Sequence, residues 1–153
     1  MKNHINKKIF WIASYPKSGN TWMRAILLSL FFTKDGIFNF KLFNQIRYFD
    51  TPGNYEFIKS LNLDDFKNLN NLSIIAKYWI EAQNKINSDN KLRLFKTHNA
   101  LGSVNNYNFT DRDNTCGCIY IVRDPRNVVI SMSNHFDTSH EENSKTFLAR
   151  KNN

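Results

Sequence analysis

The sequence predicts an α/β fold in which helices flank a central parallel sheet. Three short apolar segments, rich in β-branched and aromatic residues, are typical of buried strands and lie at residues 9–13, 92–97 and 118–123. Segments with helical spacing separate them, which indicates parallel strands joined by crossover helices. Each strand segment also ends in polar residues, and a parallel sheet gathers such ends at one edge.

The N-terminal elements follow from apolar spacing and turn residues. Residues 9–13 read IFWIA and predict a buried strand. Residues 21 to about 33 predict a helix that is apolar almost all round and therefore covered on most of its surface. Between residues 36 and 90 the sequence shows a turn at Thr51-Pro52-Gly53 and helical spacing in LDDFKNL and SIIAKYWIEAQNKI.

The C-terminal elements repeat the strand-then-helix order. LRLFKT, residues 92–97, and CIYIVR, residues 118–123, are the second and third strand candidates. The string DPRNVVISMSNHF follows, in which Asp124 can cap a helix and Pro125 can occupy its first turn without loss of an amide donor. Residues 141–153 look like the start of another helix.

Length and charge bound the classes of function. The 153 residues show one composition regime, so we expect a single domain over residues 1–153. The net charge of +8 favours a polyanionic partner, such as nucleic acid, an anionic membrane or a phosphorylated small molecule. The basic residues are scattered rather than gathered in an arm, so nucleic acid is not the expected partner. No segment reaches the length of a membrane span.

The cysteines and the other metal-ligating residue types point to no metal. Cys116 and Cys118 are separated by one residue, which suits neither an intrachain disulfide nor a four-ligand zinc site. Reduced thiols in a cytoplasmic protein are therefore expected. No cluster of metal ligands is evident in the sequence.

The first polar joint reads YPKSGNTW and links a strand to a helix. Free backbone amides and the helix dipole bind anions at such a joint, and Ser18, Gly19, Asn20 and Thr21 would supply the amides. Lys17 adds a positive charge, and Gly19 lets the backbone approach a ligand closely. Because Lys17 precedes Gly19 and no earlier glycine exists, the loop is not of the GxxxxGK[ST] type. The alternative is a simple turn with exposed polar residues.

The other joints add a histidine and further cations. Trp22, just past the first joint, could pack into the core or stack on an aromatic base. Lys96 and His98 point to the same side of the second strand end, where His98 is either a general base or a structural histidine. Arg123 ends the third strand and could bind a phosphate, with Ser131 about two turns into the next helix. Otherwise Arg123 pairs with an acid and Ser131 packs against a neighbour.

These residues resemble the motifs of the PAPS-dependent sulfotransferases. YPKSGNTW resembles the family's 5′-phosphosulfate loop, commonly YPKSGTTW, and KTH resembles its short motif with the catalytic histidine. YIVRDPRNVVISMSNHF resembles its 3′-phosphate segment, with a Pro two residues and a Ser eight residues after the Arg. The strings ASYPKSGNTW and KTHNALG look more like the bacterial members than like the animal cytosolic enzymes. The resemblance covers residues 9 to about 150 and implies a P-loop-like three-layer fold.

The resemblance implies transfer of a sulfuryl group from 3′-phosphoadenosine 5′-phosphosulfate (PAPS) to a hydroxyl or amine acceptor, without a metal. Lys17 would stabilise the leaving phosphate, and His98 would take the acceptor's proton as the acceptor attacks sulfur. Lys96 would help to stabilise the transferring sulfonate. The implied donor-binding residues are Ser18, Gly19, Asn20 and Thr21 at the 5′-phosphosulfate, Trp22 beside the adenine, and Arg123 and Ser131 at the 3′-phosphate.

The resemblance departs from the family at its C-terminal end. Family members continue with a Gly-rich segment, roughly R-K-G-x-x-G-x-W, that closes over the 3′-phosphate and adenine, whereas no glycine follows Gly117 here. We therefore expect the N-terminal portion of a sulfotransferase domain, whose open strand edge favours self-association or a C-terminal partner chain. The alternative function is a truncated, non-catalytic remnant or a half-subunit that needs a missing C-terminal segment.

Two other classes of function are weaker. A P-loop-like kinase or NTPase is opposed by the loop spelling and by the lack of a clear magnesium-binding acid, and a nucleic-acid binder rests on charge alone. The acceptor could be a carbohydrate, lipid, phenol or amine, and residues 36–90 are expected to form part of its pocket by analogy with the family. Aromatic residues there could line that pocket or belong to the core, namely Phe38, Phe40, Phe43, Tyr48 and Phe49.

Overall fold

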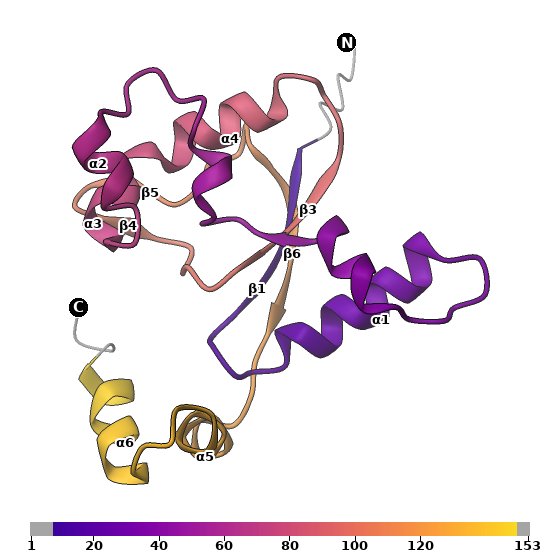
Figure 1. Ribbon diagram of the computed structural model, residues 1–153, viewed down its shortest axis with the longest axis vertical. Helices are drawn as coiled ribbons and strands as arrows, with labels where there is room; N and C mark the ends of the chain where they lie inside the picture. The colour runs from indigo at the N-terminus through magenta and orange to yellow at the C-terminus, as the bar shows by residue number, and fades with distance from the viewer. Residues whose placement is uncertain (1–7, 150–153) are drawn as a thin grey trace.

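The computed structural model describes residues 8–149 and confirms the α/β fold with a central parallel sheet (Figure 1). Four parallel strands pair in the order β2-β3-β1-β6. A separate antiparallel ribbon, β4 with β5, interrupts the connection from β3 to β6. The strand bounds are β1 Ile9–Ser14, β2 Arg47–Tyr48, β3 Arg93–Thr97, β4 Ser103–Val104, β5 Tyr107–Asn108 and β6 Thr115–Ile121.

Helices lie on both faces of this sheet, as Figure 1 shows. Helix α1 and the 3-10 helix η1 lie on one face, and α4 with the short helices before it lies on the other. Helices α5 and α6 pack against each other beyond the carboxyl edge of the sheet. The helix bounds are α1 Asn20–Phe32, η1 Phe40–Gln45, η2 Pro52–Asn54, α2 Leu63–Lys67, α3 Leu72–Ile75, η3 Ala76–Tyr78, α4 Trp79–Asn87, α5 Pro125–Phe136 and α6 His140–Ala149.

Aromatic side chains form the core between the sheet and α4. The Trp11 ring packs edge-on against Phe49, with centroids 5.1 Å apart, and against Phe109 at 4.9 Å. Trp79 from α4 packs on the same Phe109 ring at 5.2 Å. Phe49 is fully buried here. It therefore belongs to the core rather than to an acceptor pocket.

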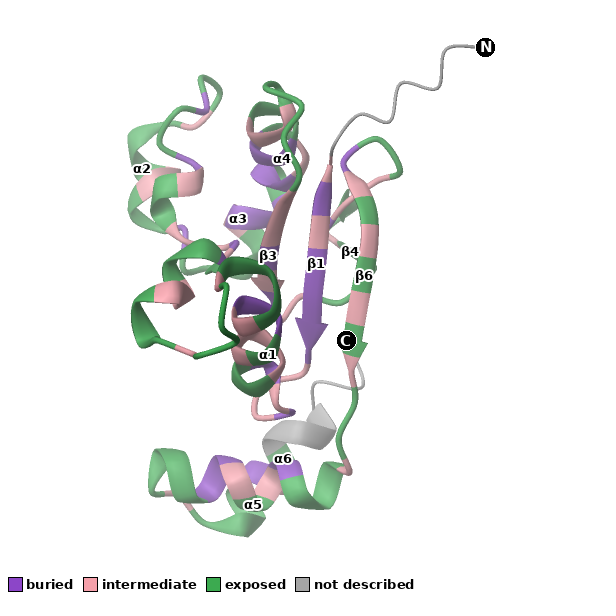
Figure 2. Ribbon diagram, turned by 90° about the vertical axis from the view of Figure 1, so that its right-hand side faces the viewer, coloured by how far each residue is buried: buried purple, intermediate pink, exposed green. Residues whose placement is uncertain are grey.

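The opposite face of the sheet carries α1. Ile12 and Leu28 are fully buried between β1 and this helix, and Figure 2 shows β1 as the most continuously buried strand. The outer side of α1 is open, since Trp22 is 78% exposed and Leu30 66% exposed. The expectation that this helix is covered on most of its surface is therefore wrong for the part of the chain that the structure describes.

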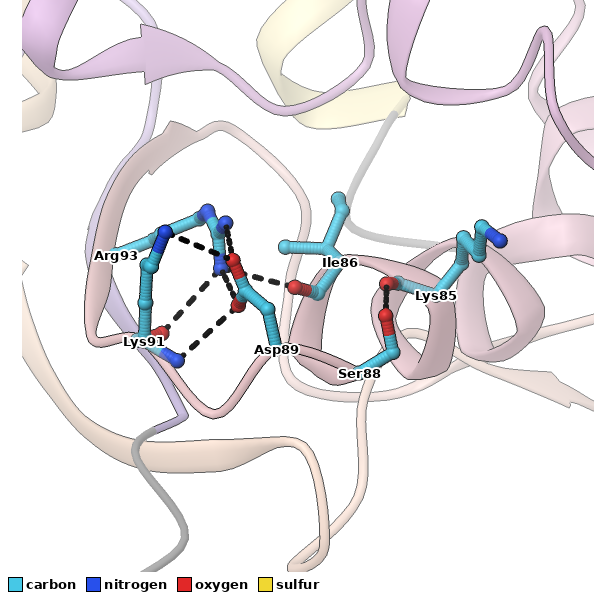
Figure 3. Close-up of polar contacts among 6 residues, drawn as sticks. All are labelled: Lys85, Ile86, Ser88, Asp89, Lys91 and Arg93. Atoms are coloured by element: carbon cyan, nitrogen blue, oxygen red, sulfur yellow. Dashed lines mark hydrogen bonds and ion pairs between the residues drawn. The ribbon is translucent and has the colours of Figure 1, made fainter.

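A compact ion pair fixes the turn from α4 to β3 (Figure 3). Arg93 donates from two nitrogens to the Asp89 carboxylate, at 2.7 and 2.6 Å, and also donates to the Ile86 carbonyl at 2.9 Å. Lys91 adds a second cation 3.6 Å from the same carboxylate. A separate cavity of about 520 Å³ opens beside this turn, at the end of β3 away from the polar joints. The fixed start of β3 sets where its carboxyl end, with Lys96, emerges.

Local sequence signals explain the remaining helices in part. Asp124 accepts a hydrogen bond from the Arg126 N–H and Pro125 begins α5, as its sequence predicts. The single helical pattern at residues 73–86 is instead divided into α3, η3 and α4. Asn71 caps the first of these segments by accepting from the Ser73 N–H. Helix α6 confirms the helical start expected after residue 140.

Strand β6 pairs with β1 on one side and forms an edge of the described sheet on its other side. Its side chains alternate between half-buried and exposed, as the pink and green bands of Figure 2 show. Cys116 and Cys118 are both free and exposed on this strand. None of the helices within residues 8–149 is long and apolar enough to cross a membrane.

Candidate active site

A cavity of about 500 Å³ lies at the carboxyl edge of the sheet, where the joints after β1, β3 and β6 meet. This volume falls within the range of small-molecule sites. Every site residue predicted from the sequence except Ser18, which is buried, lines it. Its lining comprises Pro16, Lys17, Gly19, Asn20, Thr21, Trp22, Lys96, His98, Arg123, Ser131, His135 and Phe136.

The loop after β1 adopts the backbone that an anion site requires. Lys17 and Gly19 have positive φ angles of 64° and 106°, and Gly19 is the residue before the first turn of α1. That turn has no side-chain cap. Its first N–H groups also lack acceptors within the helix, so they and the helix dipole are available to a ligand.

Asn20 has a structural task that its sequence position did not reveal. Its side chain is buried and donates to the Ile12 carbonyl at 2.9 Å and to Ser14 Oγ at 3.1 Å. The side chain thus ties the start of α1 back onto β1. The part of Asn20 that remains for a phosphate is its backbone N–H.

His98 is held in one orientation by the end of β1. Its Nδ1 lies 2.7 Å from the Ser14 carbonyl oxygen and 3.4 Å from Ser14 Oγ. Because a carbonyl only accepts, Nδ1 carries the proton, and Nε2 of the neutral ring keeps a lone pair. Burial lowers the pKa of His98, and the Lys96 charge acts in the same direction, against the hydrogen bond to Ser14. The ring is therefore favoured in its neutral, proton-accepting form.

Two cations reach the cavity from β3 and from the end of β6. Lys96 is half-buried, and burial together with the Arg24 charge lowers its pKa. Arg123 donates from Nη1 to the Lys17 carbonyl at 2.9 Å, which joins the end of β6 to the loop after β1. With Lys17, these residues give the cavity a positive lining suited to a polyanion.

Sequence reasoning missed two residues of α5 that line the cavity. His135 lies four residues after Ser131 and so shares its helix face, which is the signal that could have identified it. Phe136 is 58% exposed, and its ring packs edge-on against His135 at 4.8 Å. They form the α5 wall of the cavity.

The other aromatic residues considered for an acceptor pocket separate into two groups. Phe38, Phe40 and Phe43 pack on one another beside α1, and the Arg24 guanidinium lies 4.4 Å from the Phe43 ring centroid. Tyr48 instead lies near the cavity, with its ring 6.0 Å from that of His98. Among the five aromatic residues considered, and within the described part of the chain, Tyr48 is the one whose ring contacts predicted catalytic residues.

Comparison with known proteins agrees with this geometry. The model of the sulfotransferase domain family matches residues 7–152, which is nearly the whole chain. The chain belongs to the sulfotransferase domain family. Searches of curated proteins and of solved structures give no significant match. Membership makes the chain a sulfuryl transferase by class and favours that chemistry over an NTPase or a nucleic-acid binder. This sulfotransferase domain carries its cavity at the sheet edge where open α/β folds bind ligands.

Proposed function

We propose that this sulfotransferase domain transfers a sulfuryl group from PAPS to a hydroxyl or amine acceptor. The observation that carries the proposal is that Lys17, Lys96, His98 and Arg123, which come from three separate joints, line one cavity. Sulfuryl transfer resembles phosphoryl transfer in needing positioning and charge neutralisation rather than covalent work by the protein. A cavity with a base, three cations and free helix amides meets that need.

The donor fits the loop side of this cavity. The N–H groups at the start of α1, with Gly19 at φ 106°, suit the 5′-phosphosulfate. Ser18 supports the loop instead, since its side chain is buried and its N–H donates to the Tyr15 carbonyl at 3.3 Å. Arg123 and Ser131 suit the 3′-phosphate, and the exposed face of Trp22 suits the adenine. When bound, PAPS supplies the sulfonate that is transferred.

His98 acts as the general base in this proposal. Its Nε2 lone pair accepts the proton of the acceptor hydroxyl or amine, while Nδ1–H stays bonded to Ser14. Lys17 would stabilise the charge on the leaving phosphate, and Lys96, which lines the same cavity, would help to stabilise the transferring sulfonate. These chain residues supply the charge neutralisation that phosphoryl-transfer enzymes obtain in part from magnesium.

A second candidate function is nucleotide binding without transfer by this chain alone. The observation that favours it is the openness of the donor side, where Trp22 is 78% exposed and Arg123 is also exposed. An adenine stacked on Trp22 would then be covered on one face only. In that case another polypeptide segment, either a partner chain or a second copy, would complete the site.

The test is transfer of ³⁵S from labelled PAPS to a panel of phenol, amine, carbohydrate and lipid acceptors. Wild type, Lys17→Ala and the matched control Lys59→Ala, an exposed lysine outside the cavity, are compared. We expect transfer by wild type and the control and its loss in Lys17→Ala. Equal transfer by Lys17→Ala contradicts the assignment of the loop. Binding of 3′-phosphoadenosine 5′-phosphate (PAP) by wild type without any transfer favours the second candidate.

A further inference from the structure

Tyr48 lies directly across from Lys96 in the sheet. Strands β2 and β3 pair in parallel with these two residues in register, so their side chains project from the same face. The Lys96 Nζ lies 5.1 Å from the centroid of the Tyr48 ring, which is within the range of a cation–π interaction. The same ring lies 6.0 Å from the His98 ring. Tyr48 thus touches both acceptor-side groups of the proposed site.

The ring of Tyr48 takes the place that an acid usually has beside a lysine. Among the ion pairs of residues 8–149, none includes Lys96. A carboxylate partner would occupy the N–H donors of the ammonium group, whereas an aromatic face attracts the charge without accepting strong hydrogen bonds. The arrangement therefore keeps Lys96 in place and leaves its donors for an anionic ligand.

Asp50 lies two residues after Tyr48 in the chain and is half-buried. It accepts hydrogen bonds from Tyr55 Oη at 3.0 Å, Trp79 Nε1 at 3.2 Å and Asn99 Nδ2 at 2.6 Å. No cation of the described chain forms an ion pair with it. Burial and the Asp50 charge raise the pKa of Tyr48 to about 12, with hydrogen bonding to Asp50 acting in the same direction. The carboxylate thus holds Asn99, the residue after His98.

We propose, building on the sulfuryl-transfer function above, that Tyr48 is a further residue of the site that holds the Lys96 ammonium against its ring. The face of the ring attracts the ammonium electrostatically, and no acid of the described chain competes for its N–H groups. The N–H donors of Lys96 are then aimed at the sulfonate rather than at a protein acid.

The first arm of the test needs no ligand. Lys96 Hε protons above an aromatic face are shifted upfield in the NMR spectrum by the ring current. We expect this shift to vanish in Tyr48→Leu and to persist in Tyr48→Phe, which keeps the ring. Tyr55→Phe is the control, since it removes a tyrosine hydroxyl that bonds to Asp50 rather than to Lys96, and the shift should persist there too.

Two outcomes of this arm overturn the inference. A Lys96 Hε resonance that is not shifted in wild type, or that Tyr48→Leu leaves in place, shows that the ring does not hold the ammonium. A shift that Tyr48→Phe also abolishes shows that the face of the ring is not what holds the ammonium. Tyr48→Phe keeps the side-chain volume nearly unchanged, so this second result is accessible even if Tyr48→Leu fails to fold.

The second arm separates the inference from the proposed function. Binding of PAPS and of PAP, which lacks the sulfonate, is measured by calorimetry. We expect Tyr48→Leu to weaken PAPS about fivefold and to leave PAP nearly unchanged, because Lys96 faces the sulfonate. Equal weakening of both ligands contradicts this role. If wild type binds neither ligand while the Lys96 shift is intact, the proposed function fails and the transfer role of Tyr48 falls with it, although the contact itself stands.

Discussion

The Nδ1 atom of His98 lies 2.7 Å from the carbonyl oxygen of Ser14, so the end of β1 fixes the imidazole that follows β3. The same strand end leads into the loop of Lys17 and Gly19. One backbone turn therefore sets both the proposed base and the proposed phosphate site. The position of the proposed base relative to the proposed phosphate site is therefore set by the sheet backbone.

Replacement of His98 by Asn should abolish transfer without abolishing donor binding. Removal of a general base costs on the order of 10²- to 10⁴-fold in rate. PAP affinity should change little, because the proposed donor contacts come from the loop and from Arg123. Steady-state transfer rates beside PAP calorimetry make the comparison, with His140→Asn on exposed α6 as the control. Parallel loss of PAP binding and transfer would place His98 among structural histidines.

The pH profile of transfer should have an acid limb below the ordinary histidine pKa of about 6.5. Burial lowers the pKa of His98, so the neutral, proton-accepting ring persists to lower pH than for an exposed histidine. The dependence of kcat/KM on pH reports this ionisation in the free enzyme. An acid limb centred above the ordinary value would contradict a desolvated His98 as the base.

The same lowered pKa has a consequence for stability. The unfolded chain binds a proton on His98 at a higher pH than the folded chain does. The contribution of His98 to the free energy of unfolding is therefore at its most favourable at pH values above the ordinary histidine pKa. As pH falls below that pKa, protonation of the unfolded chain lowers the free energy of unfolding. Chemical denaturation of wild type and His98→Asn across this range should show a smaller loss of stability on acidification in the variant. An identical pH dependence of stability in both proteins would contradict this contribution of His98.

Asn20→Ala should destabilise the fold more than a surface asparagine substitution does. The side chain of Asn20 satisfies the Ile12 carbonyl and Ser14 Oγ, both near the buried end of β1. Loss of such buried hydrogen bonds costs roughly 1–3 kcal/mol. The free energy of unfolding in urea measures this, with exposed Asn134→Ala as the control. Similar small effects in both variants would show that the Asn20 tie is dispensable.

Gly19→Ala should cost about 1–2 kcal/mol of stability, through the backbone rather than through a clash. A Cβ at this position meets no atom within 4 Å, yet φ is +106°, where a side chain is strained. Gly53→Ala is a suitable control, since its added Cβ is equally free of neighbours and no positive φ applies. Thermal melts of both variants decide the matter, and equal midpoints would contradict backbone strain at the loop.

The sequence was sufficient to locate the three main strands and their polar ends because each signal is local, although β6 spans Thr115–Ile121 rather than residues 118–123. Apolar runs such as IFWIA mark buried strands, and Lys17, His98 and Arg123 follow such runs directly. The parallel topology then brings the joints together, as the cavity shows. The roles of these residues stay predictions until they are measured.

What the sequence did not reveal depends on contacts between distant segments. Strand β2 has two residues and exists only by pairing with β3, so no periodicity marks it. The contact of Tyr48 with Lys96 follows from that pairing. The inward direction of the Asn20 side chain likewise follows from the position of β1. The open face of α1 was missed because an apolar helix sequence indicates burial without showing what covers it.

The most direct test of the account is the calorimetric titration of PAP into wild type, Lys17→Ala, Arg123→Ala and the control Lys59→Ala. We predict binding by wild type and by the control, weakened about 10-fold or more in each cavity variant, as expected for charge-assisted hydrogen bonds of roughly 1.5–3 kcal/mol. Binding that is equally tight in Lys17→Ala, or no binding by folded wild type, would contradict a PAPS site in this cavity.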